Sequence, residues 1–164
     1  MATDIMIKFE GGKVPIEGES LVKGFEKQLE AVSWSEGYSN PFDPTGKGAV
    51  ASRTNAQDVS FASASSQHSN LLKRSMYSNN VFSKITVSFL KQIDNVTQAY
   101  DVREYNNAYI TSYQCSKSNE SIAFESWSIQ CMVSDAKFFV QDEATHELTE
   151  ATSVSLDLAA SAVE

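Results

Sequence analysis

Histidine, cysteine and proline are scarce in this sequence. Its 164 residues include two His, two Cys and three Pro. Cys115 and Cys131 are too few to make a disulfide framework, and their wide spacing is unlike the paired ligands of a zinc site. We therefore predict that both are buried free thiols, which pack as small hydrophobic side chains.

Long apolar runs and basic patches are missing as well. No stretch approaches the roughly 20 apolar residues of a membrane span, and the first residues show no basic segment followed by an apolar one. The net charge is -8, and the 13 Lys and Arg are scattered along the chain. These absences predict a soluble cytoplasmic chain with no membrane insertion, and they disfavour binding to the phosphate backbone of a nucleic acid.

Motifs of catalysis and of metal or phosphate binding are also absent. His68 lies among polar residues, where we expect a solvent-exposed side chain, and His146 lies in the acidic segment DEATHELTE, which predicts a surface turn. Gly11 and Gly12 lack the later glycine and the helix of a phosphate-binding loop, so they predict a turn. We find no nucleophile elbow and no helical pair of metal ligands. The sequence predicts no enzyme, no metal site and no cofactor.

What the sequence does contain is a series of short segments in which apolar and polar residues alternate. In the first, Ile5, Ile7 and Phe9 alternate with Met6 and Lys8, and this period of two indicates a strand with one buried face. Further alternating segments cover residues 29–35, 59–61, 85–89, 109–115, 127–133 and 154–158. The chain is of a length typical of one domain with its own core.

One segment has helical rather than strand spacing. Leu71, Leu72 and Met76 fall on one helical face after Ser65 and Ser66, whose hydroxyls we expect to cap a helix that runs from about residue 66 to 77. Many short strands and one helix predict an all-β fold with one helix. We expect a small β-barrel of two packed antiparallel sheets with a flanking α-helix.

The segment between residues 38 and 53, YSNPFDPTGKGAVASR, has no regular periodicity. It contains two prolines and two glycines, and it predicts a long exposed loop. Loops of this length in compact domains usually bind something unless they are disordered, and the residues alone leave both interpretations open.

Five segments in order along the chain carry a family resemblance: DIMIKFEG, IEGES, LEAVSWSEG, AQDVSFAS and YITSYQCS. They resemble successive landmarks of the hemolysin-coregulated protein (Hcp) family, which forms the inner tube of the bacterial type VI secretion system. Gly18, Glu19 and Ser20 correspond to a turn of that family. The resemblance extends from residue 1 to about residue 124. Beyond it the chain is several residues longer and keeps Gln141-Asp142 without the family's proline, which leaves the strand register there open.

The resemblance implies one tube-subunit domain over residues 1–164, with an extended loop at about 38–53 and a short tail after about 158. It implies a homohexamer whose rings stack into a hollow tube that carries effector proteins. The implied partners are the valine-glycine repeat spike protein, the contractile sheath and the baseplate proteins. The implied location is the bacterial cytoplasm, followed by secretion to the extracellular space or a target cell.

The resemblance also places residues in these assemblies. The extended loop is expected at the ring-stacking face, where Lys47 and Arg53 would meet carboxylates of the next ring. The loop residues concerned are Pro41, Phe42, Asp43, Pro44, Thr45, Gly46, Lys47, Gly48 and Arg53.

The segment LEAVSWS is expected to form one of the strands that line the channel. As one strand, it would place Leu29, Ser33 and Ser35 on one face and Trp34 on the other, in the core. Ser33 and Ser35 would then face the channel. The alternative is that they face solvent or a neighbouring subunit.

A different class of function also fits an all-β chain. A monomeric β-sandwich could bind carbohydrate or protein through exposed aromatics such as Trp34, Tyr38, Tyr113 and Trp127. Aromatic residues that alternate with polar ones are more often part of a core. The size of the purified particle distinguishes a ring from such a monomer.

Overall fold

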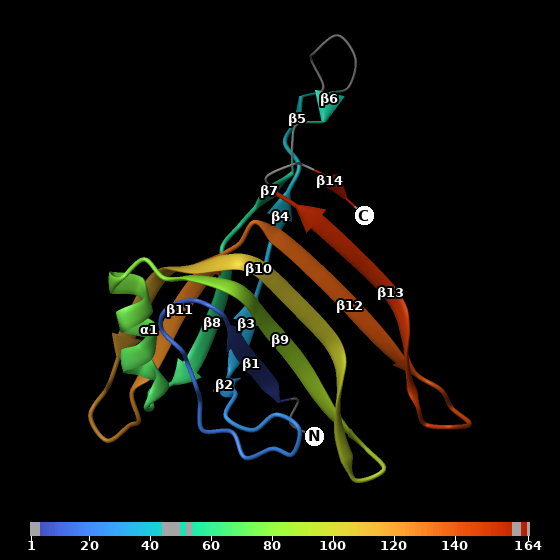
Figure 1. Ribbon diagram of the computed structural model, residues 1–164, viewed down its shortest axis with the longest axis horizontal. Coiled ribbons are helices and arrows are strands. Elements are labelled where there is room, and N and C mark those ends of the chain that lie inside the picture. Colours follow the sequence, from blue (N-terminus) through green and yellow to red (C-terminus); the bar gives the residue numbers. More distant parts are fainter. Residues whose placement is uncertain (1–3, 44–49, 52–53, 159–161, 164) are drawn as a thin grey trace.

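The chain is predominantly β-structure, as the alternating segments predict, and it carries one helix in the part that the structure describes. The computed structural model describes residues 4–43, 50–51, 54–158 and 162–163 (Figure 1). The elements are β1 (Ile5–Glu10), β2 (Leu29–Ala31), β3 (Ser33–Ser35), β4 (Tyr38–Ser39), β5 (Phe42–Asp43), β6 (Val50–Ala51), β7 (Asn55–Ala56), β8 (Val59–Ala64), α1 (His68–Tyr77), β9 (Val81–Ile93), β10 (Val96–Ser116), β11 (Phe124–Gln130), β12 (Val133–Gln141), β13 (Leu148–Asp157) and β14 (Ala162–Val163). Among the described residues, no helix is both long and apolar enough to cross a membrane.

The strand pairings form a closed, antiparallel circuit. β1 pairs with β2 and β9, β9 with β10, β10 with β11, β11 with β8, and β8 with β3. β2 and β3 meet at Val32, whose N–H donates to the carbonyl of Ala62 in β8 at 2.7 Å. The ladder therefore returns to its starting strand, which leaves few open edges in this part of the fold.

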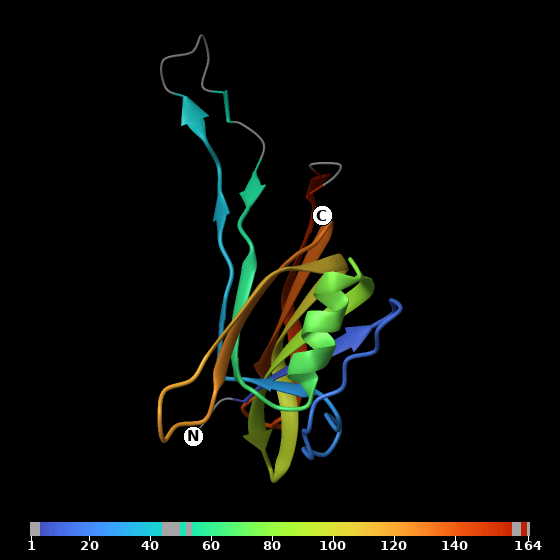
Figure 2. The ribbon, with the colours of Figure 1, turned by 90° about the vertical axis from the view of Figure 1, so that its left-hand side faces the viewer.

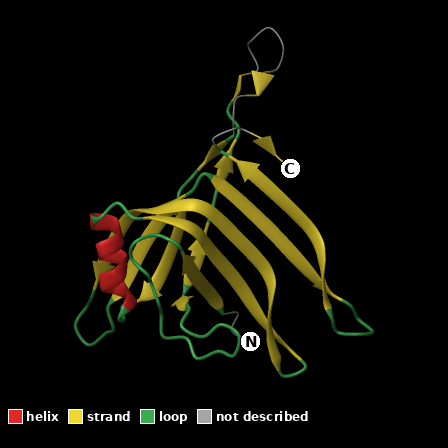
Figure 3. Cartoon of the chain, in the orientation of Figure 1, coloured by secondary structure: helices red, strands yellow, loops and turns green. Residues whose placement is uncertain are grey.

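The long strand β10 connects this circuit to a second region. Its residues 96–109 pair with β9, residues 101–106 also pair with β12, and residues 109–116 pair with β11. β12 pairs in turn with β13, and β13 with β14. Figure 3 shows these last strands as a ribbon on one side, with the helix on the other side. The flanking helix that the sequence predicts is confirmed.

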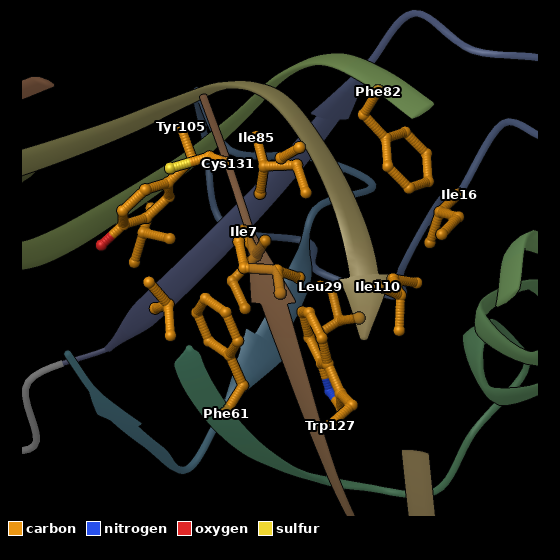
Figure 4. Close-up of a cluster of buried hydrophobic side chains, with 14 of the residues drawn as sticks. Ile7, Ile16, Leu29, Phe61, Phe82, Ile85, Tyr105, Ile110, Trp127 and Cys131 are labelled. Atoms are coloured by element: carbon orange, nitrogen blue, oxygen red, sulfur yellow. The ribbon is translucent and has the colours of Figure 1, made fainter. Parts of the chain in front are cut away.

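The core fills the inside of the strand circuit (Figure 4). Phe61 and Trp127 stack with ring centroids 4.4 Å apart, and Trp127 also lies 5.8 Å from Phe9. Burial of apolar side chains of this size is the main stabilising contribution to such a fold. The buried cluster includes Ile7, Ile16, Leu29, Val59, Phe61, Leu72, Phe82, Ile85, Val87, Tyr105, Ala108, Ile110, Trp127, Ile129 and Cys131.

The segment from Leu29 to Ser35 is not one continuous strand. A bend at Val32, which is 65% exposed, separates β2 from β3. Leu29 is buried, and Trp34 also packs against the core. The prediction that these two side chains lie on opposite faces was therefore wrong, because a one-residue irregularity reverses the alternation that follows it.

The predicted strand over residues 127–133 is also divided. β11 ends at Gln130 and β12 begins at Val133, and both pair with the edge of β10 that lies opposite β9, in one continuing register. Between them, the N–H of Met132 donates to the carbonyl of Asn106 at 3.1 Å. The short interruption leaves the register unchanged, and the pairing that the sequence left open is therefore defined: Ser134 of β12 pairs with Tyr105 of β10.

The helix begins later than predicted and without the expected serine cap. Its cap residue is Gln67, which makes no side-chain capping bond. The hydroxyls of Ser65 and Ser66 bond instead to Ser69 Oγ at 3.1 Å and to His68 Nδ1 at 2.6 Å. The apolar helical face is confirmed, because its residues are buried or pack against the core: Leu71, Leu72, Ser75 and Met76.

Residues 38–56, which we call the arm, contain regular pairing despite the lack of periodicity. β4 pairs with β7 and β5 pairs with β6, both antiparallel. Figures 1 and 2 show the arm projecting well beyond one end of the barrel. The described part of the arm is therefore a narrow hairpin rather than an irregular loop. Backbone hydrogen bonds hold such a hairpin, and they need no alternation of side chains.

The two cysteines differ in their surroundings. Both are free thiols, but Cys131 is buried whereas Cys115 is exposed. The prediction of two buried thiols was thus wrong for Cys115, which lies near the end of β10 where the barrel no longer covers it.

Candidate functional site

The outer surface of four adjacent strands carries small polar side chains in register. Ser35 of β3 lies opposite Ser60 of β8, Ser60 opposite Ser128 of β11, and Ser128 opposite Ser112 of β10. Two residues along, a parallel row consists of Ser33, Ala62, Ser126 and Gln114. We call these two rows the polar face. Both serines that the resemblance assigned to the channel lie on it and are exposed.

Two hydroxyls of this face, those of Ser112 and Ser128, are bonded to each other and through Thr111 to a neighbouring carboxylate. Ser128 Oγ lies 2.5 Å from Ser112 Oγ and 2.7 Å from Thr111 Oγ1, and Thr111 donates to Asp58 at 2.8 Å. Gln130 Nε2 donates to the same carboxylate at 3.2 Å. The strands form a shallow hollow of about 460 Å³ here. Because the hydroxyls of Ser112 and Ser128 are already paired, this part of the face offers few strong contacts to a passing molecule.

A row of aromatic residues lies directly beneath the polar face. In register, Trp34 is followed by Phe61, Trp127 and Tyr113. Trp127 is only 1% exposed, and Trp34 makes an edge contact with Phe89 at 5.0 Å. These aromatics hold the four strands rigid from the inside. Of the four proposed for a carbohydrate platform, only Tyr38 is exposed, at 43%, so these four do not form such a platform together.

A buried polar cluster, which we call the anchor cluster, connects the helix to β11. His68 Nε2 lies 2.5 Å from Glu125 Oε1, and the other carboxylate oxygen accepts the hydroxyl of Tyr113 at 2.6 Å. Ser63 also donates to Glu125, at 3.0 Å. His68 is 4% exposed and Glu125 is 2% exposed. The prediction of a solvent-exposed His68 was wrong, because the first turn of the helix packs on the barrel.

The charge state of this cluster follows from its contacts. Burial raises the pKa of the Glu125 carboxyl, but the hydrogen bonds from His68 and Tyr113 outweigh it, so the pKa lies below its ordinary value. Burial and the neighbouring carboxylate raise the pKa of the Tyr113 hydroxyl. Glu125 is therefore held as an anion. A buried anion is stable inside the fold only while its hydrogen-bond donors are present.

Ser66, His68 and Glu125 are hydrogen-bonded in the same order as the serine, histidine and acid of a hydrolytic triad. The groups around these three residues differ from those of a triad. The N–H of Ser66, which could otherwise stabilise an oxyanion, donates to Ser69 Oγ at 3.1 Å. Glu125 is occupied by Tyr113 and Ser63 as well as by His68. The cluster fixes the position of the helix rather than presenting a reactive hydroxyl.

A second polar cluster fixes the base of the arm, and we call it the arm root. Arg103 Nη1 donates to Glu36 at 2.5 Å, and the hydroxyl of Tyr105 donates to the same carboxylate at 2.8 Å. The Arg103 guanidinium lies 5.2 Å from the centre of the Trp34 ring. Tyr38 and Ser134 share a hydrogen bond of 3.0 Å. The arm therefore leaves the barrel in a defined direction.

The remaining residues that the resemblance assigned to assembly lie in two places. Pro41 is exposed, and Phe42 and Asp43 form the backbone of β5. Pro44, Thr45, Gly46, Lys47, Gly48 and Arg53 lie outside the described residues.

Gly18 to Ser20 lie on one side of a turn rather than at its tip. Gly18 N–H donates to Lys27 at 2.8 Å, and Ser20 N–H donates to Gln28 at 3.2 Å. The chain reverses between these two segments.

Sequence reasoning missed the anchor cluster, although one signal was present. Glu125 alternates with Trp127 and Ile129 in the strand pattern FESWSIQ, which places a carboxylate on the buried face. A buried carboxylate requires a cationic or hydrogen-bonding partner, and the chain has only two histidines.

Comparisons with known proteins agree on one family. A family model described as "Type VI secretion system effector, Hcp" matches residues 6–133. A search of curated protein sequences finds no match.

Solved structures resemble the whole chain. A structure described as a type six secretion system protein has a TM-score of 0.86 at 17% identity, and the match covers 99% of this chain and 100% of the other. Hcp1 from Salmonella typhimurium has a TM-score of 0.74 at 16% identity, with 98% and 97% covered. Hcp3 from Pseudomonas aeruginosa has a TM-score of 0.67 at 15% identity, with 95% and 98% covered. At these identities the likeness establishes the fold.

Proposed function

The chain belongs to the Hcp family of type VI secretion proteins, whose model matches residues 6–133, and from this premise we propose that it closes into hexameric rings. These rings stack into a hollow tube that carries effector proteins in its lumen. The family is one of structural tube proteins, so the chain is not an enzyme. Its family membership implies export by type VI secretion.

The observation that supports this proposal most directly is the polar face. A channel that passes folded cargo needs a wall without exposed apolar patches or unpaired charges, since either would retain the cargo. The two rows from Ser35 to Ser112 and from Ser33 to Gln114 provide small, neutral side chains across four strands. We assign this face to the lumen.

The arm supports the stacking of rings. It projects from one end of the barrel (Figure 2), and its root is held by Arg103, Glu36 and Tyr105. We assign the arm residues named above, from Pro41 to Arg53, to the contact with the next ring. The valine-glycine repeat spike protein, the contractile sheath, the baseplate and the effectors are the partners that this role requires.

Purified protein should form hexamers without any added ligand. The circuit of strands gives a rigid subunit, and identical subunits that use two different surfaces close into rings when the rotation between them closes. Mass photometry, with sedimentation at tens of micromolar subunit as a check, measures the particle size. A particle of six subunits supports the ring. A purely monomeric species would contradict it and favour a binding module.

Replacing Ser35 with glutamine should reduce the amount of effector that copurifies with each ring. The side chain is exposed on the polar face, so the change should alter the free energy of unfolding by no more than about 0.5 kcal/mol. In a hexamer, however, each of the six subunits would place the larger side chain at the same level of the lumen, which would narrow the channel there. Ser153→Gln on exposed β13 is the matched control. Unchanged loading by an intact Ser35→Gln ring would remove Ser35 from the lumen.

A further inference from the structure

A small groove lies beside the arm root, between β4 and the ribbon of β12 and β13. Its volume is about 270 Å³, and its walls include Tyr38, Ala136, Val154 and Leu156. Ala136 lies opposite Val154 in the ladder. The polar groups at its floor are already paired, because Glu36 accepts from Arg103 and Tyr38 bonds to Ser134. The groove therefore offers apolar surface to an occupant, with Val154 51% exposed.

The most exposed large hydrophobic side chain among the described residues is Leu21, at 92%. It belongs to the turn between Ser20 and Gln28, whose backbone is fixed. Lys27 N–H donates to the carbonyl of Ser20 at 2.9 Å, and Val22 N–H donates to Ser20 Oγ at 3.3 Å. Ser20 itself is buried. The fold thus holds an apolar side chain outward on a rigid support, so little conformational entropy is lost when it binds.

The turn and the groove lie at opposite ends of the subunit. Figures 1 and 2 share a vertical axis, and in both the arm projects upward while the turn that leads into β2 lies at the lower end. The groove lies at the arm end, where β12 begins and β13 approaches its own end. In a stack of copies in the same orientation along this axis, the end of one copy that carries the turn would face the arm end of the next.

We propose that Leu21 of one copy inserts into the groove beside the arm root of a copy in the adjacent ring. The inference rests on the proposed stacking of rings and names the second contact surface, apart from the arm. The Leu21 side chain and the groove lie on different surfaces of the subunit, so a contact between them is heterologous. Such a contact repeats in one direction and gives every ring the same polarity. With a net charge of -8 on each chain, copies repel one another at long range, so an apolar contact supplies attraction that charge does not.

Disulfide trapping tests this contact directly. Leu21→Cys and Val154→Cys are combined with Cys115→Ser, which removes the exposed native thiol, and preformed tubes are oxidised. Non-reducing gels should then show covalent ladders longer than six subunits, since each bond joins two rings. Val81→Cys with Val154→Cys is the matched control, because Val81 is 52% exposed but lies at the start of β9 rather than on the turn. It should give no such ladder.

Removal of the Leu21 side chain gives an independent test of the contact. Leu21→Ser should leave hexamers intact and raise the subunit concentration needed for tubes by about tenfold or more, because one leucine burial is lost at each of six contacts per ring. Val96→Ser, at a residue 55% exposed in the β9–β10 hairpin, controls for loss of any exposed apolar side chain.

The outcomes separate the two proposals. Ladders that stop at six subunits, absent crosslinks, or normal tubes from Leu21→Ser would each overturn the contact while leaving the tube subunit intact. Failure of the unaltered protein to form rings or tubes would overturn the proposed function and this contact with it.

Discussion

Replacing His68 with alanine should lower the free energy of unfolding by about 3 kcal/mol or more, the largest effect that we expect from a single substitution. The variant keeps Glu125 inside the fold, where it is 2% exposed, but removes its shortest contact, the 2.5 Å bond to His68 Nε2. A buried carboxylate that loses its partner keeps the cost of desolvation without the compensating interaction. The melting temperature should fall by about 6–12 °C.

The second histidine provides a matched control. His146 Nδ1 lies 3.0 Å from Asp94, but the two side chains are 51% and 68% exposed. A solvent-exposed ion pair contributes about 0–1 kcal/mol, so His146→Ala should be almost neutral. Denaturant unfolding of both variants and the unaltered protein gives the comparison. Equal losses for His68→Ala and His146→Ala would contradict the structural role of the anchor cluster.

The pH dependence gives a further test of the same cluster. The pKa of Glu125 is lowered in the folded state. Its contribution to stability is therefore present above the ordinary carboxyl pKa and is lost as the pH falls through the lowered folded value. The difference in unfolding free energy between the unaltered protein and His68→Ala should narrow in acid, since a protonated carboxyl no longer needs the histidine. A difference that stays constant as the pH falls would show that Glu125 is not the group involved.

Replacing residues 43–50 with a short Gly-Ser linker should abolish tubes and secretion while leaving rings intact. The arm root stays in place, because Arg103, Glu36 and Tyr105 and the 2.8 Å bond from Gln57 N–H to the carbonyl of Gly37 lie outside the exchanged segment. The shortened arm would no longer extend as far beyond the end of the barrel (Figure 1). Electron microscopy of assembled protein and a secretion assay measure the two effects.

A second linker separates the length of the arm from its chemistry. Eight Gly-Ser residues in place of the same eight positions keep the length but remove the side chains, including Lys47. Each exposed ion pair across a stacking contact contributes only about 0.5 kcal/mol, so this variant should assemble better than the shortened one. Normal secretion by the shortened variant would contradict the assignment of the arm to ring stacking.

The sequence by itself determined the fold class and the family. Alternation in segments such as Val59 to Phe61 indicates strands with one buried face, and the helical spacing from Leu71 to Met76 indicates one helix. The first strand departs from this pattern, because Met6 on its other face is also buried. These periodicities are local properties of the backbone, so they can be read without knowing which strands pair. The ordered motifs from residue 4 to residue 116 likewise indicated the family that the comparisons confirm.

The tertiary structure alone decided where those local patterns are interrupted and which residues far apart in the chain meet. The bend at Val32, the break between Gln130 and Val133, and the burial of His68 against Glu125, 57 residues away, leave no local periodic signal. The bend at Val32 arises where the chain passes from its pairing with β1 to its pairing with β8. The break after Gln130 and the contact of His68 with Glu125 depend on neighbouring elements that are distant along the chain. Local alternation records only the preference of each segment, whereas packing and the pairing of buried polar groups act between segments.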